Sequence, residues 1–254
     1  MELTLTDAET ADAGLVWARP EPGTRQSRFS REQIAAAALT IADADGFEAV
    51  SMRRIAAALG AGTMSLYRYV ATKAELLALI DDALLAEALV PDPLPGDWRP
   101  ALTAVARQTR LAYLGHPWAV QALQGKTAPR AAPAGPNGLR HFEQSLAALA
   151  SAPLTMLAKL DLLAIVDDYV FGHLLHAAEL TGRHRGADNP GAAAAAEFIT
   201  SRIASGEFPH LAALAADPAA RTIADDRQAD ARFELGLQLL IDGYGRVAAR
   251  NGSS

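Results

Sequence analysis

Residues 51–73 read SMRRIAAALGAGTMSLYRYVATK. Ser51 is a favoured N-cap residue, and a helix is predicted over residues 52–59 directly after it. Gly60-Ala61-Gly62 interrupts the helical pattern and predicts a turn. A second short helix is expected over residues 63–70, because apolar side chains return there at a four-residue spacing. Two short helices joined by a glycine turn are typical of a helix-turn-helix.

The second helix of such a motif enters the major groove of DNA, which is wide enough for one α-helix. Hydroxyl, guanidinium and thioether groups on its exposed side can reach bases or phosphates. We expect this of Thr63, Met64, Ser65, Tyr67, Arg68 and Tyr69. Phosphate contacts are expected at helix N-termini or the adjoining turn, from Ser51, Arg53 and Lys73. The pattern alone also fits a small surface hairpin with a solvated arginine and two half-buried tyrosines.

The residues on either side extend this motif to a three-helix domain over residues 28–74, which we call the head. Ser30 and Gln33 form a capping-box pattern at the start of a helix that ends at Gly46. A second capping box, Thr72 to Glu75, starts the next helix, which runs to about residue 89. Residues 1–27 have no apolar period and are expected to be a disordered arm.

Residues 75–254, which we call the body, are also expected to be helical, so the predicted fold class is all-α. Prolines at 91, 93 and 95 stop the preceding helix. Further helices are predicted over residues 98–114, 117–124, 136–150, 153–180, 192–204 and 227–250. Loops are expected at 125–135 and 181–191, with a proline-marked connection near Pro209 and Pro218.

Composition limits the classes of protein that fit. The chain has no cysteine, and its first twelve residues are acidic, unlike a secretory signal. The longest apolar stretch, near residues 160–170, is interrupted by three aspartates and is unsuited to a membrane span. We therefore expect a cytoplasmic protein with no membrane segment and no cofactor.

Charge is distributed unevenly along the chain. The net charge is −6, but residues 19–73 contain eight basic and five acidic residues, a balance of +3, which leaves −9 for the rest. A basic head on an acidic body is suited to holding DNA at one end. Ordinary charge scatter explains the same difference equally well.

Residues 31–77 resemble the N-terminal domain of the TetR family of repressors. The matching positions are Ala38, Gly46, Ser51-Met52-Arg53, Ile55-Ala56, Leu59-Gly60, Ser65-Leu66-Tyr67, Val70, Lys73 and Leu76-Leu77. The runs HPWAVQAL (116–123), GPNGLRHFEQSLAAL (135–149) and DARFELGLQLLIDGYGRV (230–247) are similar to the C-terminal domain of the tetracycline-repressor subgroup. The resemblance implies a homodimeric regulator, by family habit a repressor, that binds palindromic operator DNA and is released by a small-molecule effector.

The resemblance also implies that helices near residues 154–180 and 227–250 pair with their mates in a four-helix bundle. The sequence permits this, because an apolar and glycine stripe at four-residue spacing runs along the last helix: Leu235, Leu239, Gly243 and Val247. Packing of this stripe within its own subunit is the alternative.

The effector pocket is expected among the helices of the body, with an apolar lining and a few polar groups. Its candidate residues are Trp98, Thr109, Tyr113, Trp118, Gln121, Asn137, His141 and Phe171. The family's histidine ligand for metal-bound tetracycline falls near Leu123, which binds no metal, so that effector is not expected. His173, His176 and Glu179 have a spacing that suits a metal, but such a trio is more often solvated, and no metal site is predicted.

Two other functions compete with this interpretation. An enzyme would have to use the cluster Asp161, Asp167, Asp168, His173 and His176, which lacks a nucleophile or a phosphate loop beside it. A helical dimeric adaptor with a degenerate head would keep its partner when Tyr67, Arg68 and Lys73 are changed.

Overall fold

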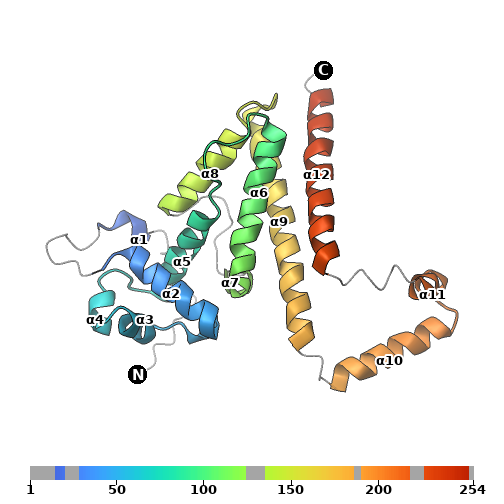
Figure 1. The fold of residues 1–254 in the computed structure, drawn as a ribbon, viewed down its shortest axis with the longest axis horizontal. Helices are drawn as coiled ribbons and strands as arrows, with labels where there is room; N and C mark the ends of the chain where they lie inside the picture. Colours follow the sequence, from blue (N-terminus) through green and yellow to red (C-terminus); the bar gives the residue numbers. More distant parts are fainter. Residues whose placement is uncertain (1–14, 21–28, 124–134, 186–189, 218–225, 252–254) are drawn as a thin grey trace. The chain divides into compact units, whose positions relative to one another are not determined.

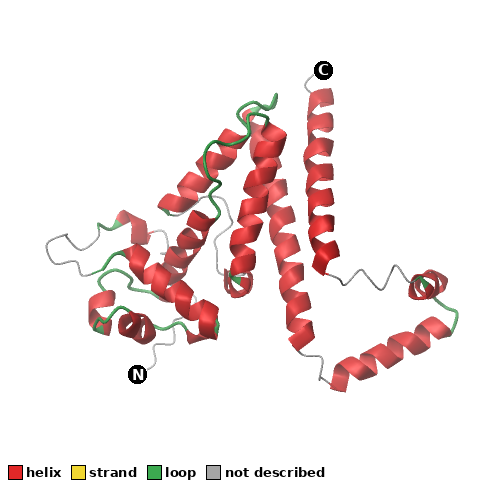
Figure 2. Cartoon of the chain, viewed as in Figure 1, coloured by secondary structure: helices red, strands yellow, loops and turns green. Residues whose placement is uncertain are grey.

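The computed structural model describes residues 15–20, 29–123, 135–185, 190–217 and 226–251. Every regular element in these ranges is a helix, which confirms the predicted all-α class (Figure 2). The chain divides into two compact units, Met1–Leu175 and His176–Ser254.

The head contains α2 (Arg31–Asp45), the short 3₁₀-helix η2 (Phe47–Ala49), α3 (Met52–Ala58) and α4 (Thr63–Leu66). The predicted capping box at the start of α2 is present: the Gln33 amide donates to Ser30 Oγ, and the Ser30 amide donates to Gln33 Oε1. The core of the head consists of apolar side chains that are almost fully buried, namely Ile34, Ala38, Ile55, Leu66 and Val70.

Helix α4 is shorter than predicted. It ends at Leu66, and the amides of Tyr69 and Val70 both donate to the Leu66 carbonyl, at 2.9 and 3.1 Å. The chain after α4 therefore continues as a turn. Of the helix predicted over residues 63–70, only residues 63–66 are helical, and the rest form the turn.

Part of the predicted disordered arm is helical. Leu15–Ala18 form α1, and Val16 is completely buried. Residues 1–14 and 21–28 lie outside the described residues. The expectation of an arm without structure is therefore wrong for residues 15–20, where an apolar side chain inserts into the protein.

The first unit continues with α5 (Lys73–Glu87), α6 (Trp98–Gly115), α7 (Pro117–Leu123), α8 (Pro136–Ala148) and the greater part of α9 (Met156–Arg185). Helix α5 packs on α2 of the head and on α6 and α8 of the body, so it connects the two parts (Figure 1). Leucine and isoleucine side chains fill its contact faces: Leu76, Leu79, Ile80 and Leu84.

The second unit contains the end of α9, α10 (Pro190–Ala204), α11 (Pro209–Ala216) and α12 (Asp226–Asn251). The prediction missed α11, because Pro209 suggested a connection. Proline is also favoured in the first turn of a helix, which is where Pro209 lies. No helix in the described residues is both long and apolar enough to cross a membrane.

Candidate DNA interface and effector region

Helix α3 and the turn after it are fixed by capping and by backbone geometry. Ser51 Oγ accepts the Arg54 amide at the start of α3. Gly60 has φ of +62°, a left-handed conformation that favours glycine. The Ala61 amide then donates to the Ala56 carbonyl at 2.8 Å, which closes the end of α3. Burial of Leu66 anchors α4 against the head and leaves its other side free.

The free side of α4 and the turn after it carry the predicted DNA-contacting groups. Met64 is 79% exposed and Tyr67 37% exposed, and Ser65 and Arg68 are also exposed. Thr63 is half-buried at the first position of the helix. A large exposed thioether beside hydroxyl and guanidinium groups is suited to contacts with thymine methyls, bases and phosphates.

Tyr69 does not belong to this surface. Tyr69 is only 4% exposed, because the turn after Leu66 directs its side chain into the head. The prediction that its side chain is exposed like those of Tyr67 and Arg68 is therefore wrong.

The residues predicted to contact phosphates lie at the starts of α3 and α5, the helices before and after α4 in the chain. Ser51, Arg53 and Lys73 are all exposed at the start of a helix. Lys73 Nζ lies 5.6 Å from the centre of the Phe47 ring, which holds its ammonium group near the first turn of α5. The amide dipoles at that end add to the positive potential.

His116 joins the head to the body. Its Nδ1 lies 2.7 Å from Asp43 Oδ1 at the end of α2, and its Nε2 lies 3.1 Å from Glu87 Oε2 at the end of α5. Burial disfavours the charged imidazole. Asp43 and Glu87 stabilise it through hydrogen bonds and through their negative charge, and these effects outweigh burial, so the pKa of His116 is raised. His116 is therefore an ionic link between three elements.

An aromatic contact strengthens the same link. Trp118 Nε1 donates to Asp43 Oδ1 at 2.7 Å, and the Trp118 ring stacks on Phe47 with centroids 5.5 Å apart. Trp118 was predicted to line the effector pocket. The structure places it instead against η2 of the head, where α7 packs.

Four of the predicted effector residues form two contact pairs in the body. Thr109 Oγ1 lies 2.9 Å from His141 Nε2, and the Tyr113 ring meets Phe171 edge-on with centroids 4.8 Å apart. Thr109 and Tyr113 are four residues apart and share one face of α6. Burial lowers the pKa of His141, which favours the neutral imidazole. The group combines aromatic faces with neutral hydrogen-bonding atoms.

Asn137 and Trp98 are held at the starts of α8 and α6. The Asn137 amide and its Nδ2 both donate to the Asp82 carboxylate, which anchors the start of α8 on α5. Trp98 is buried at the start of α6, eleven residues from Thr109. The side chain of Gln121 lies outside the described residues.

The alternative metal site has no support among the residues that the structure describes, where no group of three or more His, Asp or Glu side chains is arranged to hold a metal ion. The side chain of Glu179 lies outside them. His173 and Asp167 both have partners within the protein.

The sequence interpretation missed two groups of residues. Neither Asp43 nor Glu87 was singled out, and His116 was noticed only as part of a matching run. Arg19 and Arg31 were treated as general positive charge. In each group the partners are far apart in the chain, so no local pattern connects them.

Comparison with known proteins agrees with this arrangement. The family described as "Bacterial regulatory proteins, tetR family" matches residues 34–80, and "Tetracyclin repressor-like, C-terminal domain" matches residues 90–247. The chain is 36% identical to HTH-type transcriptional repressor DrrR1 of Streptomyces coeruleorubidus over 93% of this chain and 84% of the relative. It is 34% identical to an HTH-type transcriptional regulator of Saccharopolyspora erythraea, over 96% of each chain.

A solved structure gives the same result. The TetR family protein ActR of Streptomyces coelicolor, in complex with actinorhodin, superposes with a TM-score of 0.67 and 31% identity, covering 87% of this chain and 97% of that one. The matched relatives are named as regulators rather than enzymes. With a helix-turn-helix that exposes its second helix and a helical body matched over residues 90–247, the chain belongs to the TetR family of DNA-binding transcriptional regulators.

Proposed function

We propose that this regulator is a repressor that binds a palindromic operator as a homodimer and is released by a small organic effector. The exposed row of Met64, Ser65, Tyr67 and Arg68, on α4 and the turn after it, carries the proposal. One such helix reads few base pairs, so two heads on an inverted repeat supply the specificity. The name of the similar DrrR1 favours repression. Binding to operator DNA in a bacterium implies a cytoplasmic protein.

Exposed apolar side chains support the dimer. On α12, Phe233, Leu237 and Ile241 are buried, while Leu235 and Leu239 between them are 59% and 58% exposed. A helix with apolar residues on both sides needs a second partner to cover the exposed row. We propose that the mate's helices cover it, with Gly243 allowing a close approach; Val247 has its side chain outside the described residues.

The effector is proposed to contact the group of Thr109, Tyr113, His141 and Phe171. These residues offer aromatic faces and neutral hydrogen-bonding atoms, which suit a flat molecule that carries hydroxyl or carbonyl groups. ActR, which is 31% identical, was crystallised with actinorhodin, so that compound is the first probe. A shift of α6 would reach the head through His116, which follows α6 directly.

The test is fluorescence anisotropy of a labelled duplex from beside the protein's own gene. We expect tight binding by the wild type, loss with Arg68→Ala, and little change with Arg202→Ala, which removes an exposed arginine from α10. Release by a small molecule, with actinorhodin tried first, should require His141, so His141→Phe should raise the concentration needed. Equal binding of wild type and Arg68→Ala would contradict a reading role for α4.

A further inference from the structure

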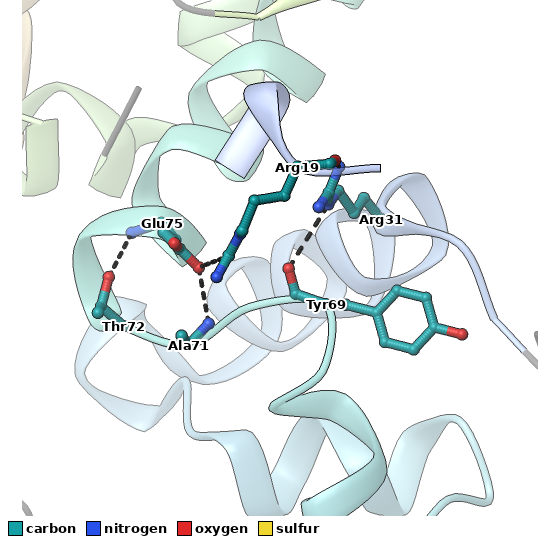
Figure 3. A network of polar contacts seen from close by, with 6 residues as sticks. All are labelled: Arg19, Arg31, Tyr69, Ala71, Thr72 and Glu75. Carbon is teal, nitrogen blue, oxygen red and sulfur yellow. Dashed lines mark hydrogen bonds and ion pairs between the residues drawn. The ribbon is translucent and has the colours of Figure 1, made fainter. Parts of the chain in front are cut away.

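The short segment before the head is tied to it by charged side chains. Arg19, directly after α1, donates from Nη2 to Glu75 Oε2 at 2.6 Å. The backbone carbonyl of Arg19 accepts from Arg31 Nη1 at 2.9 Å. Figure 3 shows Arg19 and Arg31 reaching from two different segments toward the loop between Tyr69 and Glu75.

Glu75 is the centre of this network. It is only 3% exposed, and the same Oε2 that meets Arg19 also accepts the Ala71 amide at 2.7 Å. The amide of Glu75 donates to Thr72 Oγ1 at 3.1 Å, which caps α5. Glu75, in the first turn of α5, thus holds the loop that follows α4, which we call the reading helix. A buried carboxylate needs a cationic partner, and Arg19 provides one.

Arg31 reaches the same loop from the other side. It is 4% exposed, and besides its bond to the Arg19 carbonyl its Nε donates to the Tyr69 carbonyl at a long 3.5 Å. Two carbonyls, one before the head and one after α4, therefore share one guanidinium group. The planar fork of arginine is suited to this, since its donors point in fixed directions.

We propose that Arg19, Arg31 and Glu75 form a brace that positions the reading helix for DNA, and that residues 15–20 are a working part of the head. The brace holds residues 69–75, which connect the base-contacting side chains of α4 to Lys73 at the start of α5. Because phosphate and base contacts must form together, a loop that moves by a fraction of an ångström weakens specific binding more than non-specific binding. The inference rests on operator binding by α4.

The test compares Arg19→Ala, Arg19→Lys and the double variant Arg19→Ala/Glu75→Gln, with Arg202→Ala as the control for loss of an arginine ion pair. The measurements are binding to operator and to scrambled duplex, thermal stability, and hydrogen exchange of the Ala71 amide. Arg19→Ala should lose about 10-fold in operator affinity, the effect of one charge-assisted hydrogen bond, with little change on scrambled DNA. Its Ala71 amide should exchange faster, and Arg19→Lys should recover part of both effects.

The double variant separates positioning from stability. It removes the unpaired buried charge, so its stability should return toward that of the wild type while its operator affinity stays low. Recovery of both would show that Arg19 only stabilises the fold, and would overturn the proposal. A hydrogen-exchange rate of the Ala71 amide that is the same in Arg19→Ala as in the wild type would overturn it as well. This measurement is made on the protein without DNA. Failure of the wild type to bind any operator would instead count against the proposed function.

Discussion

The contact between head and body predicts a pH-dependent loss of stability when His116 is replaced by alanine. The imidazole makes two hydrogen bonds to carboxylates, at 2.7 and 3.1 Å, and its side chain is 11% exposed. A buried bond of this kind contributes about 1.5–3 kcal/mol. The side chains of Asp43 and Glu87 are 39% and 50% exposed, so solvent screening reduces each bond to about 1 kcal/mol. His116→Ala should therefore lower the free energy of unfolding by about 2 kcal/mol.

The sign of the pH dependence follows from the raised pKa of His116. Its contribution to stability is complete below the pKa of an unfolded-state histidine, about 6.5, and is lost as the pH rises through the higher pKa of the folded state. The difference between wild type and His116→Ala should therefore be larger at pH 6 than at pH 9.

Urea unfolding followed by tryptophan fluorescence measures this difference, because Trp118 stacks beside the altered site. Protein concentration must be held constant, since dimerisation adds to the measured stability. His210→Ala, which replaces an exposed histidine on α11, is the control and should change little at either pH. A loss for His116→Ala that is the same at pH 6 and pH 9 would show that the charged imidazole does not stabilise the contact between head and body.

Three further predictions concern the head and the dimer. Lys73→Gln should reduce the slope of log K against log salt by about 1, the loss of one phosphate contact, in the anisotropy assay; an unchanged slope would remove Lys73 from the interface. Gly60→Ala should destabilise the protein by about 1 kcal/mol in thermal denaturation, because φ of +62° strains any residue with a Cβ; no loss of stability would contradict the geometry of the turn. Leu235→Glu with Leu239→Glu should yield a monomer by light scattering, whereas Gln238→Glu on the same helix should remain a dimer; a dimeric double variant would place the interface elsewhere.

Local patterns in the sequence predicted most of the helices. The capping box at Ser30 and the N-cap at Thr72 depend on residues three positions apart, so they can be predicted without a structure. The capping box predicted at Thr72 is only half present: the Glu75 amide donates to Thr72 Oγ1, but the Glu75 carboxylate accepts the Ala71 amide instead of reaching back to Thr72. The glycine turn before α4 is equally local. Helix α11 was missed because proline marks both the end and the beginning of helices.

Tertiary contacts were beyond the reach of these patterns. Arg19 and Glu75 are 56 positions apart, and Asp43 and His116 are 73 apart. Tyr69 was predicted to be exposed together with the other DNA-contacting candidates of residues 63–69, but the chain after Leu66 turns and the Tyr69 side chain is buried. In each of these cases the packing of segments that are distant in the chain decides which side chains meet and which are buried.

Selection of binding sites from a random duplex library tests whether the head recognises an operator. The selected duplex and a scrambled version are then compared with the purified protein across a salt series. We expect an inverted repeat with two half-sites, bound at least about 10³-fold more tightly than the scrambled duplex, with affinity falling steeply as salt rises. A library that yields no enriched sequence, with equal binding to both duplexes at every salt concentration, would contradict recognition of an operator by the head.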